Sequence, residues 1–470
     1  MRKTINFKRY HDACEIYLKI AIAADAKSDI ETITRNYITN LLNYGISKEH
    51  LFEINKRVFF DETNPVSSIE KIDEFFALLS PKIHNFDVYF KAKLSIHEIR
   101  ESNSAFSLRV LDKLPQDVCA PKKYNGFILG NDECYVQISD ITATDMIAAY
   151  TKAEQRLDMV SDLLAFYSHK KTLEWSQSAL VQKKCCEIIC MEISRPRNSM
   201  SKGRNFKSNF AAARLNTLIS DLSLRGGSFR KFNQVVDLHG MALASDVPSN
   251  QLLNLWISLE TIVPSSRSGK TTINKITNSI MPFILEGYVR RLVVNLTKDL
   301  YYWNRRCTGE LLNKAPNNGK ATMKALQMLS LDECTEIRSS FYSKLTNFPL
   351  LRQRIYNLSE KLSTPNKIIH LLGQHQQKVE WQLRRIYRTR NSVVHAGSEP
   401  LYTNVLIENC HDYLDIVLNS IIRLSCQDYS ASSLDQAFEL GQIHYQKFLR
   451  ELKKLDSFSS TNIGFMVGSK

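Results

Sequence analysis

The segment Arg390–His395 gathers three side chains whose chemistry suits a phosphate group. Arg390 has a planar, permanently charged guanidinium whose donors match phosphate oxygens. His395 can give or take a proton near neutral pH. Asn391 can orient a polar group through its amide. A cation, an orienting amide and a proton carrier therefore lie within one turn or two of each other if the segment is helical.

The residues around this segment predict that it closes a long helix. Residues 378–389 are rich in strong helix formers. Gly397 suits a left-handed helix cap, and Pro400 follows as a stop. We therefore expect the three side chains to lie in the last turns of that helix.

Helical spacing places these residues on two different rows. Asn391 and His395 are four residues apart and share a face with Arg384 and Arg388. Arg390 instead falls on an apolar row, where a cation is costly unless a carboxylate or a phosphate pairs with it. The apolar members of that row are Val379, Leu383, Ile386 and Val393. Arg390 is thus either a structural arginine that pairs with a buried carboxylate, or an arginine that pairs partly with a carboxylate and remains available to bind a phosphate.

A second predicted helix offers the carboxylate. Residues 254–260 form an apolar segment in which Trp256 and Glu260 are spaced to share a face. Glu260 is then expected to point inward and to need a partner. Arg390 is the partner that we expect.

The Arg390–His395 segment resembles the signature of the HEPN superfamily, and specifically of its ApeA-like branch. In that family, four to six residues separate the arginine from the histidine, and an asparagine often follows the arginine. Arg388 also fits the looser spacing and is a second candidate for the motif arginine. We favour Arg390 because Asn391 directly follows it.

Two flanking segments are similar to the same family. Residues 254–260 resemble its first helix. The block that begins at His411, within a helix predicted over residues 401–426, resembles its last core helix. The resemblance covers residues 248–426, and it implies an all-α HEPN bundle there.

The resemblance implies a metal-independent endoribonuclease with no cofactor. The ribose 2′-hydroxyl would attack the phosphorus and leave a 2′,3′-cyclic phosphate and a 5′-hydroxyl. His395 would act as general acid or base, and Arg390 would stabilise the pentavalent phosphate. Asn391 would position either the phosphate or His395. Glu260 and His411 would be supporting residues.

The resemblance also implies partners and a biological role. One imidazole does not obviously move both protons, and HEPN proteins commonly dimerise, so a homodimer or a higher oligomer is expected. HEPN ribonucleases of this kind act in bacterial anti-phage defence, as toxins that cut transfer RNA or other RNA and halt growth. A phage-derived trigger or a companion defence protein would then control the enzyme. The alternatives are a non-catalytic HEPN adapter and a scaffold that binds RNA or a protein.

The charge of the chain agrees with an RNA substrate. Lys and Arg number 62 against 48 Asp and Glu, which gives a net charge of +14. Residues 246–470 hold 28 basic and 19 acidic residues, so 28 − 19 = 9 of these positive charges lie there. Arg384, Arg385 and Arg388 flank a tyrosine and are predicted to bind substrate phosphates and bases.

Composition also indicates a compartment. No apolar run is long enough to span a bilayer, and charged residues interrupt any signal-like core near the N-terminus. The ten cysteines are scattered, which favours a reducing cytoplasm. Residues 185–190 hold the one cysteine cluster, but no histidine adjoins it in sequence, so we expect an apolar strand there and no metal site.

The sequence predicts two domains and a tail. Residues 1–245 are expected to form a mixed α+β sensing or regulatory domain, residues 246–456 an all-α HEPN bundle with a helical insertion, and residues 457–470 a flexible tail. Within the first domain, we predict helices over residues 10–79 and then several strands with one long helix. The predicted features are strands 86–94 and 106–111, a hairpin around residues 130–132, a helix opened by Thr142 or Thr144 that runs to Tyr167, and a strand over residues 179–193.

Overall fold

The computed structural model describes residues 6–66, 68–97, 106–116, 118, 127–169, 173–186, 188–201, 208–265, 271–316, 319–426 and 429–467. The chain divides into two compact units, Met1–Asn198 and Ser199–Lys470. The division lies ahead of the boundary expected at residues 245–246. The reason is that Phe232 and Val235 are buried in the same core as Leu255, so residues before 245 belong to the second unit.

The N-terminal unit begins with the predicted helical region. Its four helices are α1 (Phe7–Ala23), α2 (Lys27–Tyr44), α3 (Lys48–Phe59) and α4 (Lys71–Leu78). They bury a core that includes Tyr37, Leu41 and Phe75.

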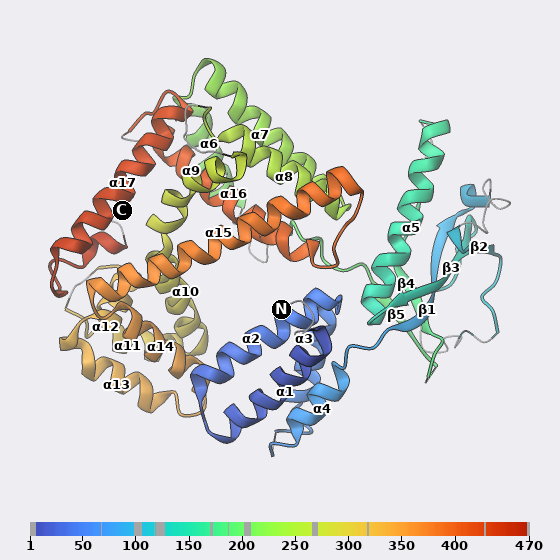
Figure 1. The fold of residues 1–470 in the computed structure, drawn as a ribbon, viewed down its shortest axis with the longest axis horizontal. Helices are drawn as coiled ribbons and strands as arrows, with labels where there is room; N and C mark the ends of the chain where they lie inside the picture. Colours follow the sequence, from blue (N-terminus) through green and yellow to red (C-terminus); the bar gives the residue numbers. More distant parts are fainter. Residues whose placement is uncertain are drawn as a thin grey trace. The chain divides into compact units, whose positions relative to one another are not determined.

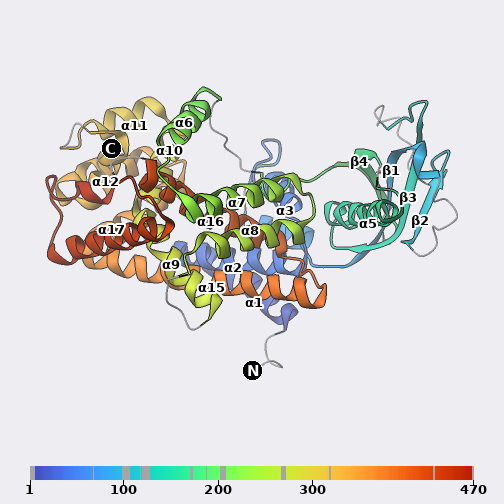
Figure 2. The ribbon, with the colours of Figure 1, turned by 90° about the horizontal axis from the view of Figure 1, so that it is seen from above.

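An antiparallel sheet follows, with strand order β2-β3-β1-β4-β5. The strands are β1 (His84–Lys93), β2 (Leu108–Leu111), β3 (Glu133–Ala143), β4 (Trp175–Lys183) and β5 (Ile189–Ser194). Helix α5 (Met146–Tyr167) covers one face of the sheet (Figures 1 and 2). There Tyr150 packs its ring 5.3 Å from that of Phe90. The unit is therefore mixed α+β, as expected.

Two local predictions for this unit were wrong. The expected hairpin around residues 130–132 does not form, because β3 pairs with β1 and β2 instead. Phe127 is buried, and its carbonyl accepts a hydrogen bond from the Tyr135 hydroxyl at 2.9 Å.

Helix α5 is capped by Asp145 and not by Thr142 or Thr144, since the Asp145 carboxylate accepts a hydrogen bond from the Ala148 amide.

The expected strand over residues 179–193 is also wrong, because two strands occupy it. β4 ends at Lys183 and β5 begins at Ile189. Cys185 and Cys186 lie in the turn between them, where Cys186 has a φ of 66°. Residues 184–186 belong to no strand, so the chain leaves the sheet between β4 and β5.

All elements described in the C-terminal unit are helical. They include α6 (Ser208–Asp221), α7 (Gly226–Ala244), α8 (Pro248–Ile262), α9 (Thr272–Glu286), α10 (Tyr288–Trp303), α11 (Arg305–Leu312), α12 (Ala321–Ser330), α13 (Thr335–Lys344), α14 (Pro349–Leu362), α15 (Pro365–Ala396), α16 (Thr403–Cys426) and α17 (Leu434–Lys454). Figure 1 shows α15 running from the group around α12 and α14 to α8. Within the described residues, no helix has the length and apolarity needed to cross a bilayer.

The flexible tail predicted for residues 457–470 was wrong for the part that the structure describes, which ends at residue 467. Ile463, Met466 and Val467 are buried in the core of the C-terminal unit. The serine-rich composition suggested a solvated tail, but these three apolar side chains anchor it.

Candidate functional site

Helix α15 carries the motif in its last turns, as predicted. The helix spans 32 residues and begins at Pro365, directly after the N-cap Thr364, whose hydroxyl accepts a hydrogen bond from the Lys367 amide. It ends at Gly397, which adopts a φ of 58° and donates its amide to the Val393 carbonyl. The left-handed cap that only glycine adopts without strain therefore fixes where the motif helix stops.

The ion pair expected between Arg390 and Glu260 is present and joins α15 to α8. The Arg390 Nη2 lies 3.9 Å from the Glu260 Oε2, and the two side chains are 23% and 28% exposed. Glu260 is also held by Trp256, whose buried indole Nε1 donates to Oε1 at 2.7 Å. The Trp256 ring lies 5.4 Å from that of Tyr387 on α15. Glu260 is thus anchored on its own helix, and α15 packs against that anchor.

The guanidinium of Arg390 is only partly satisfied. Its Nη1 donates to the Asn391 Oδ1 at 3.1 Å. Its Nε is buried and has no hydrogen-bond partner among the described residues. An ion-pair distance of 3.9 Å is too long for a hydrogen bond. Because 23% of the side chain remains exposed, the guanidinium could take an additional anionic partner at its exposed edge.

His395 lies apart from this group. It is exposed in the last turn of α15. Among the described residues, no hydrogen bond or ion pair reaches its imidazole. The structure thus brings Glu260, Arg390 and Asn391 together, whereas His395 follows Asn391 by one helical turn and faces solvent.

Arg384, Arg385 and Arg388 line one cleft of about 680 Å³, here called the arginine cleft. The Arg385 guanidinium lies 3.9 Å from the centre of the Tyr402 ring. Trp381, which is 65% exposed, also lines the cleft. Trp381 and Tyr402 were not predicted, although an exposed tryptophan beside three arginines was a visible signal. Aromatic rings beside cations suit base stacking and phosphate contacts.

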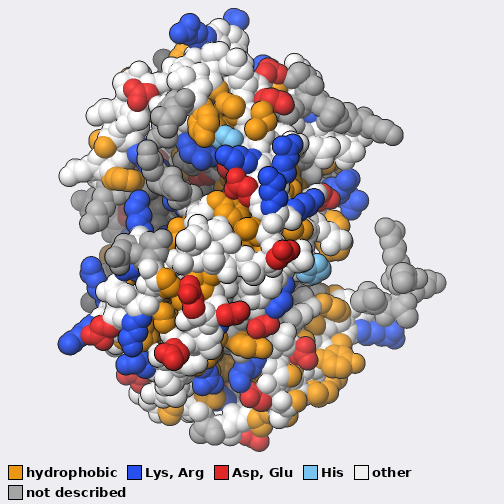
Figure 3. All heavy atoms as spheres, turned by 90° about the vertical axis from the view of Figure 1, so that its left-hand side faces the viewer, with side chains coloured by type: hydrophobic (Ala, Val, Ile, Leu, Met, Phe, Trp, Pro, Cys, Tyr) orange, Lys and Arg blue, Asp and Glu red, His pale blue; other side chains and the backbone are white. Residues whose placement is uncertain are grey.

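The arginine cleft is a local feature of the surface. Its lining residues do not include Arg390, Asn391 or His395. On the face of the molecule that Figure 3 presents, Lys and Arg side chains are interspersed with Asp and Glu side chains. The net charge of the chain therefore does not by itself produce a uniform basic surface on that face.

His411 belongs to a different cluster from the motif. It is buried on α16, and its Nε2 lies 2.9 Å from the Nε2 of His239 on α7. Both imidazoles approach Asp415, at 3.6 and 3.7 Å. Two imidazoles and a carboxylate could hold a metal ion or share a proton. His239 was not predicted, because it is 172 residues away from His411 in sequence. Asp415 was also not predicted, although its spacing of four residues from His411 was a visible signal.

A second group that could hold a metal lies in the N-terminal unit and consists of His84, Cys185 and Cys186. Burial lowers the pKa of His84. The pKa of the Cys185 thiol is also lowered, mainly by a hydrogen bond with the backbone of Asn85. Both shifts favour the deprotonated forms that ligate metals.

A cavity of about 970 Å³ in the C-terminal unit is lined by residues from α9, α10, α15, α16 and α17. Arg291, His375, Asp412 and His444 are among its lining residues. Burial lowers the pKa of His375 to about 4. None of the predicted site residues lines this cavity, so it is separate from the motif.

Comparison of the chain with protein-family models, curated proteins and solved structures gives no match. The resemblance to the HEPN superfamily therefore rests on the motif and its flanking helices.

The geometry of Glu260 predicts unequal costs for two substitutions. Glu260→Ala should lower the free energy of unfolding by about 2–3 kcal/mol, because it leaves the buried Trp256 indole and the Arg390 guanidinium without their carboxylate. Arg390→Ala should cost about 1 kcal/mol, since Glu260 keeps the indole and the ion pair is long. Urea denaturation of the full chain, followed by circular dichroism, measures both.

The matched control is Glu360→Ala on α14. Glu360 is exposed and pairs with Lys367 at 3.4 Å, so its loss should change stability by less than about 0.5 kcal/mol. Equal costs for Glu260→Ala and Arg390→Ala would contradict the proposed anchoring by Trp256.

Proposed function

We propose that this chain is a metal-independent endoribonuclease of HEPN type that cuts RNA through attack of the ribose 2′-hydroxyl. The observation that carries the proposal is the state of Arg390. Its Nη1 donates a hydrogen bond to Asn391, the Glu260 carboxylate lies 3.9 Å from its Nη2, and 23% of the side chain remains exposed. A positioned guanidinium that is partly exposed and not fully paired suits the stabilisation of charge as it develops on a phosphate.

The roles of the other motif residues follow from their places on α15. Asn391 keeps the guanidinium oriented through its 3.1 Å hydrogen bond. His395, exposed one turn further on, is free of the ion-pair network and available to carry a proton. The 2′-hydroxyl nucleophile restricts the substrate to RNA. No step of this chemistry requires a metal ion.

A homodimer would complete the site. Cleavage needs one proton removed from the 2′-hydroxyl and one given to the leaving oxygen, and each chain offers one motif histidine. The exposure of His395 at the end of α15 leaves it accessible to a second copy of the chain. Two copies would then supply two imidazoles to one phosphate.

The biological role that we propose is a regulated toxin in bacterial anti-phage defence. Residues 246–456 of the C-terminal unit, with α9–α14 inserted between α8 and α15, would be the HEPN domain and would act on transfer RNA or another cytoplasmic RNA. The mixed α+β N-terminal unit would sense a phage-derived trigger or dock a companion protein. This role rests on the family resemblance.

A second candidate function is a non-catalytic HEPN adapter or scaffold. One observation favours it. The arginine cleft has the side chains to bind RNA, yet it does not include the motif residues. Such a protein would bind RNA without cutting it.

Cleavage assays distinguish the two functions. Purified full-length protein should cut labelled RNA in the presence of EDTA and leave 2′,3′-cyclic phosphate ends. His395→Ala should lower the rate by about 10²-fold or more, because general acid–base catalysis contributes that much.

The matched control is His370→Ala, since His370 is also exposed on α15 but lies near its other end. This variant should cut at the wild-type rate. Equal cleavage by His395→Ala and the wild type would overturn the role of His395. RNA binding without cleavage by the wild type, whether or not a dimer forms, would favour the adapter.

The arginine cleft predicts a binding defect that is separate from catalysis. Arg385→Ala and Arg388→Ala should weaken RNA binding, and each should reduce the slope of log K against log salt concentration by about one. Fluorescence anisotropy with labelled RNA measures the slope. Arg306→Ala is the control, because Arg306 is exposed on α11 and pairs with Glu310. An unchanged slope in the two cleft variants would exclude the cleft as a phosphate-binding surface.

A further inference from the structure

In the N-terminal unit, sheet pairing brings together a histidine and two cysteines that are about one hundred residues apart in sequence. His84 is the first residue of β1, and Cys185 and Cys186 lie in the turn that follows β4. Strands β1 and β4 are antiparallel neighbours, with Phe86 opposite Lys183. The start of β1 therefore lies beside the β4–β5 turn.

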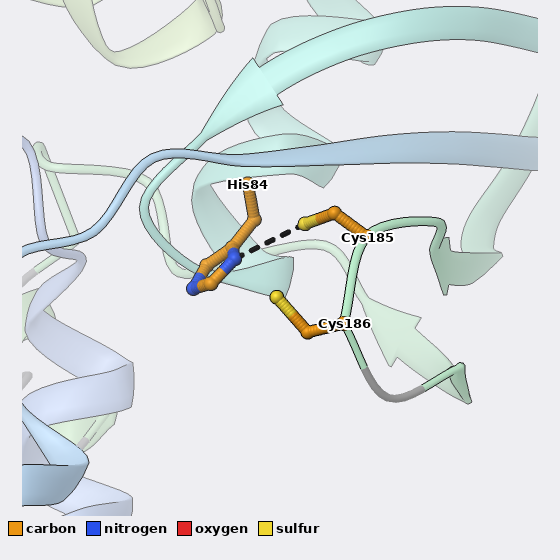
Figure 4. A group of neighbouring side chains, drawn as sticks. All are labelled: His84, Cys185 and Cys186. Carbon is orange, nitrogen blue, oxygen red and sulfur yellow. Dashed lines mark hydrogen bonds between the residues drawn. The ribbon is translucent and has the colours of Figure 1, made fainter.

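The three side chains converge on one point. The Nδ1 of His84 lies 3.2 Å from the Sγ of Cys185. The ligand atoms of all three residues lie within 4.8 Å of one another. Figure 4 shows both sulfur atoms directed toward the His84 ring. In a tetrahedral zinc site with Zn–S of about 2.3 Å and Zn–N of about 2.0 Å, ligand atoms are roughly 3.3–3.8 Å apart. Small side-chain shifts would therefore produce that geometry.

The backbone of the turn contributes to this convergence. Cys186 has a φ of 66°, a conformation that residues with a side chain seldom adopt. Among the described residues, Cys186 is the one cysteine that has a positive φ. Strain of this kind persists where the surrounding structure requires it, and here it accompanies the placement of two adjacent sulfurs on one side of the turn.

The neighbouring cysteine does not belong to the group. Cys190 lies in β5 opposite Gln182, and it packs against the apolar cluster that contains Tyr89 and Leu180. The ligand set is therefore two cysteines and one histidine, with the fourth position left for water or another ligand. Thiolate and imidazole together select soft or borderline ions such as Zn²⁺ over Mg²⁺ or Ca²⁺.

We propose that His84, Cys185 and Cys186 form a zinc-binding site with one open coordination position. The ion would tie the start of β1 to the β4–β5 turn. The site belongs to the N-terminal unit, and the proposal is independent of the ribonuclease function proposed for the C-terminal unit.

Cobalt(II) is the probe that tests this site, because tetrahedral Co²⁺ bound to thiolates has intense sulfur-to-metal charge-transfer absorption. The reduced, metal-free full chain should bind about one Co²⁺ with that absorption, and added Zn²⁺ should remove it. The double variant Cys185→Ser/Cys186→Ser should lose the charge-transfer band. Cys190→Ser is the matched control and should keep it.

A third variant keeps the test decisive if the double variant fails to fold. His84→Asn retains both sulfurs and should bind Co²⁺ more than about 100-fold more weakly, because losing a residue outside the ligand set costs only about 10–100-fold. Wild-type protein with free thiols that shows no charge-transfer band would overturn the proposal. A band that survives in a folded Cys185→Ser/Cys186→Ser variant would also overturn it. Co²⁺ bound without a sulfur band would place the ion elsewhere, for example at His239, His411 and Asp415, and would count against the site.

Discussion

A single guanidinium held between two helices is the constraint on which the candidate site depends. Arg390 lies on the apolar row of α15, where Val379, Leu383 and Ile386 are buried. It is tolerated there because Glu260 reaches it from α8. Glu260 is in turn fixed by the buried indole of Trp256, so the position of the charge is set before any substrate binds. In the proposed endoribonuclease, a charge positioned in this way would need little reorganisation on binding a phosphate, which is a main source of electrostatic catalysis.

In the C-terminal unit, the arginine that pairs with Glu260 and the arginines that would contact RNA lie at different places on α15. The face of α15 that packs on α8 holds Arg390, whereas Arg384, Arg385 and Arg388 line a cleft with Trp381 and Tyr402. The first arrangement suits contact with one phosphate, and the second suits a longer stretch of RNA through charge and stacking. His395 lies at the exposed end of the same helix. A long, rigid α15 thus connects the groups that would bind, orient and react.

The sequence predicted the features that depend on short spacing. Gly397 and Pro400 located the end of α15, and the four-residue period of the helix identified Arg390 and Glu260 as partners. Apart from the Arg390–Glu260 pair, contacts between the distant segments named below were missed, because no local period links them. His84 meets Cys185 through strand pairing, and His239 meets His411 through the packing of α7 on the helices beside it. The tail was misjudged for a related reason, since three apolar residues among serines were enough to bury it.

The most direct test of this account is the single-turnover cleavage rate of Arg390→Lys beside that of Arg388→Lys, with protein in saturating excess over RNA. Lysine keeps the charge but loses the planar fork that Glu260, Asn391 and a phosphate would share. The account predicts that Arg390→Lys cuts about 10²–10³-fold more slowly, while Arg388→Lys stays within several-fold of the wild type. Wild-type cleavage by Arg390→Lys, or a larger loss in Arg388→Lys, would contradict the assignment of Arg390 as the phosphate-stabilising residue.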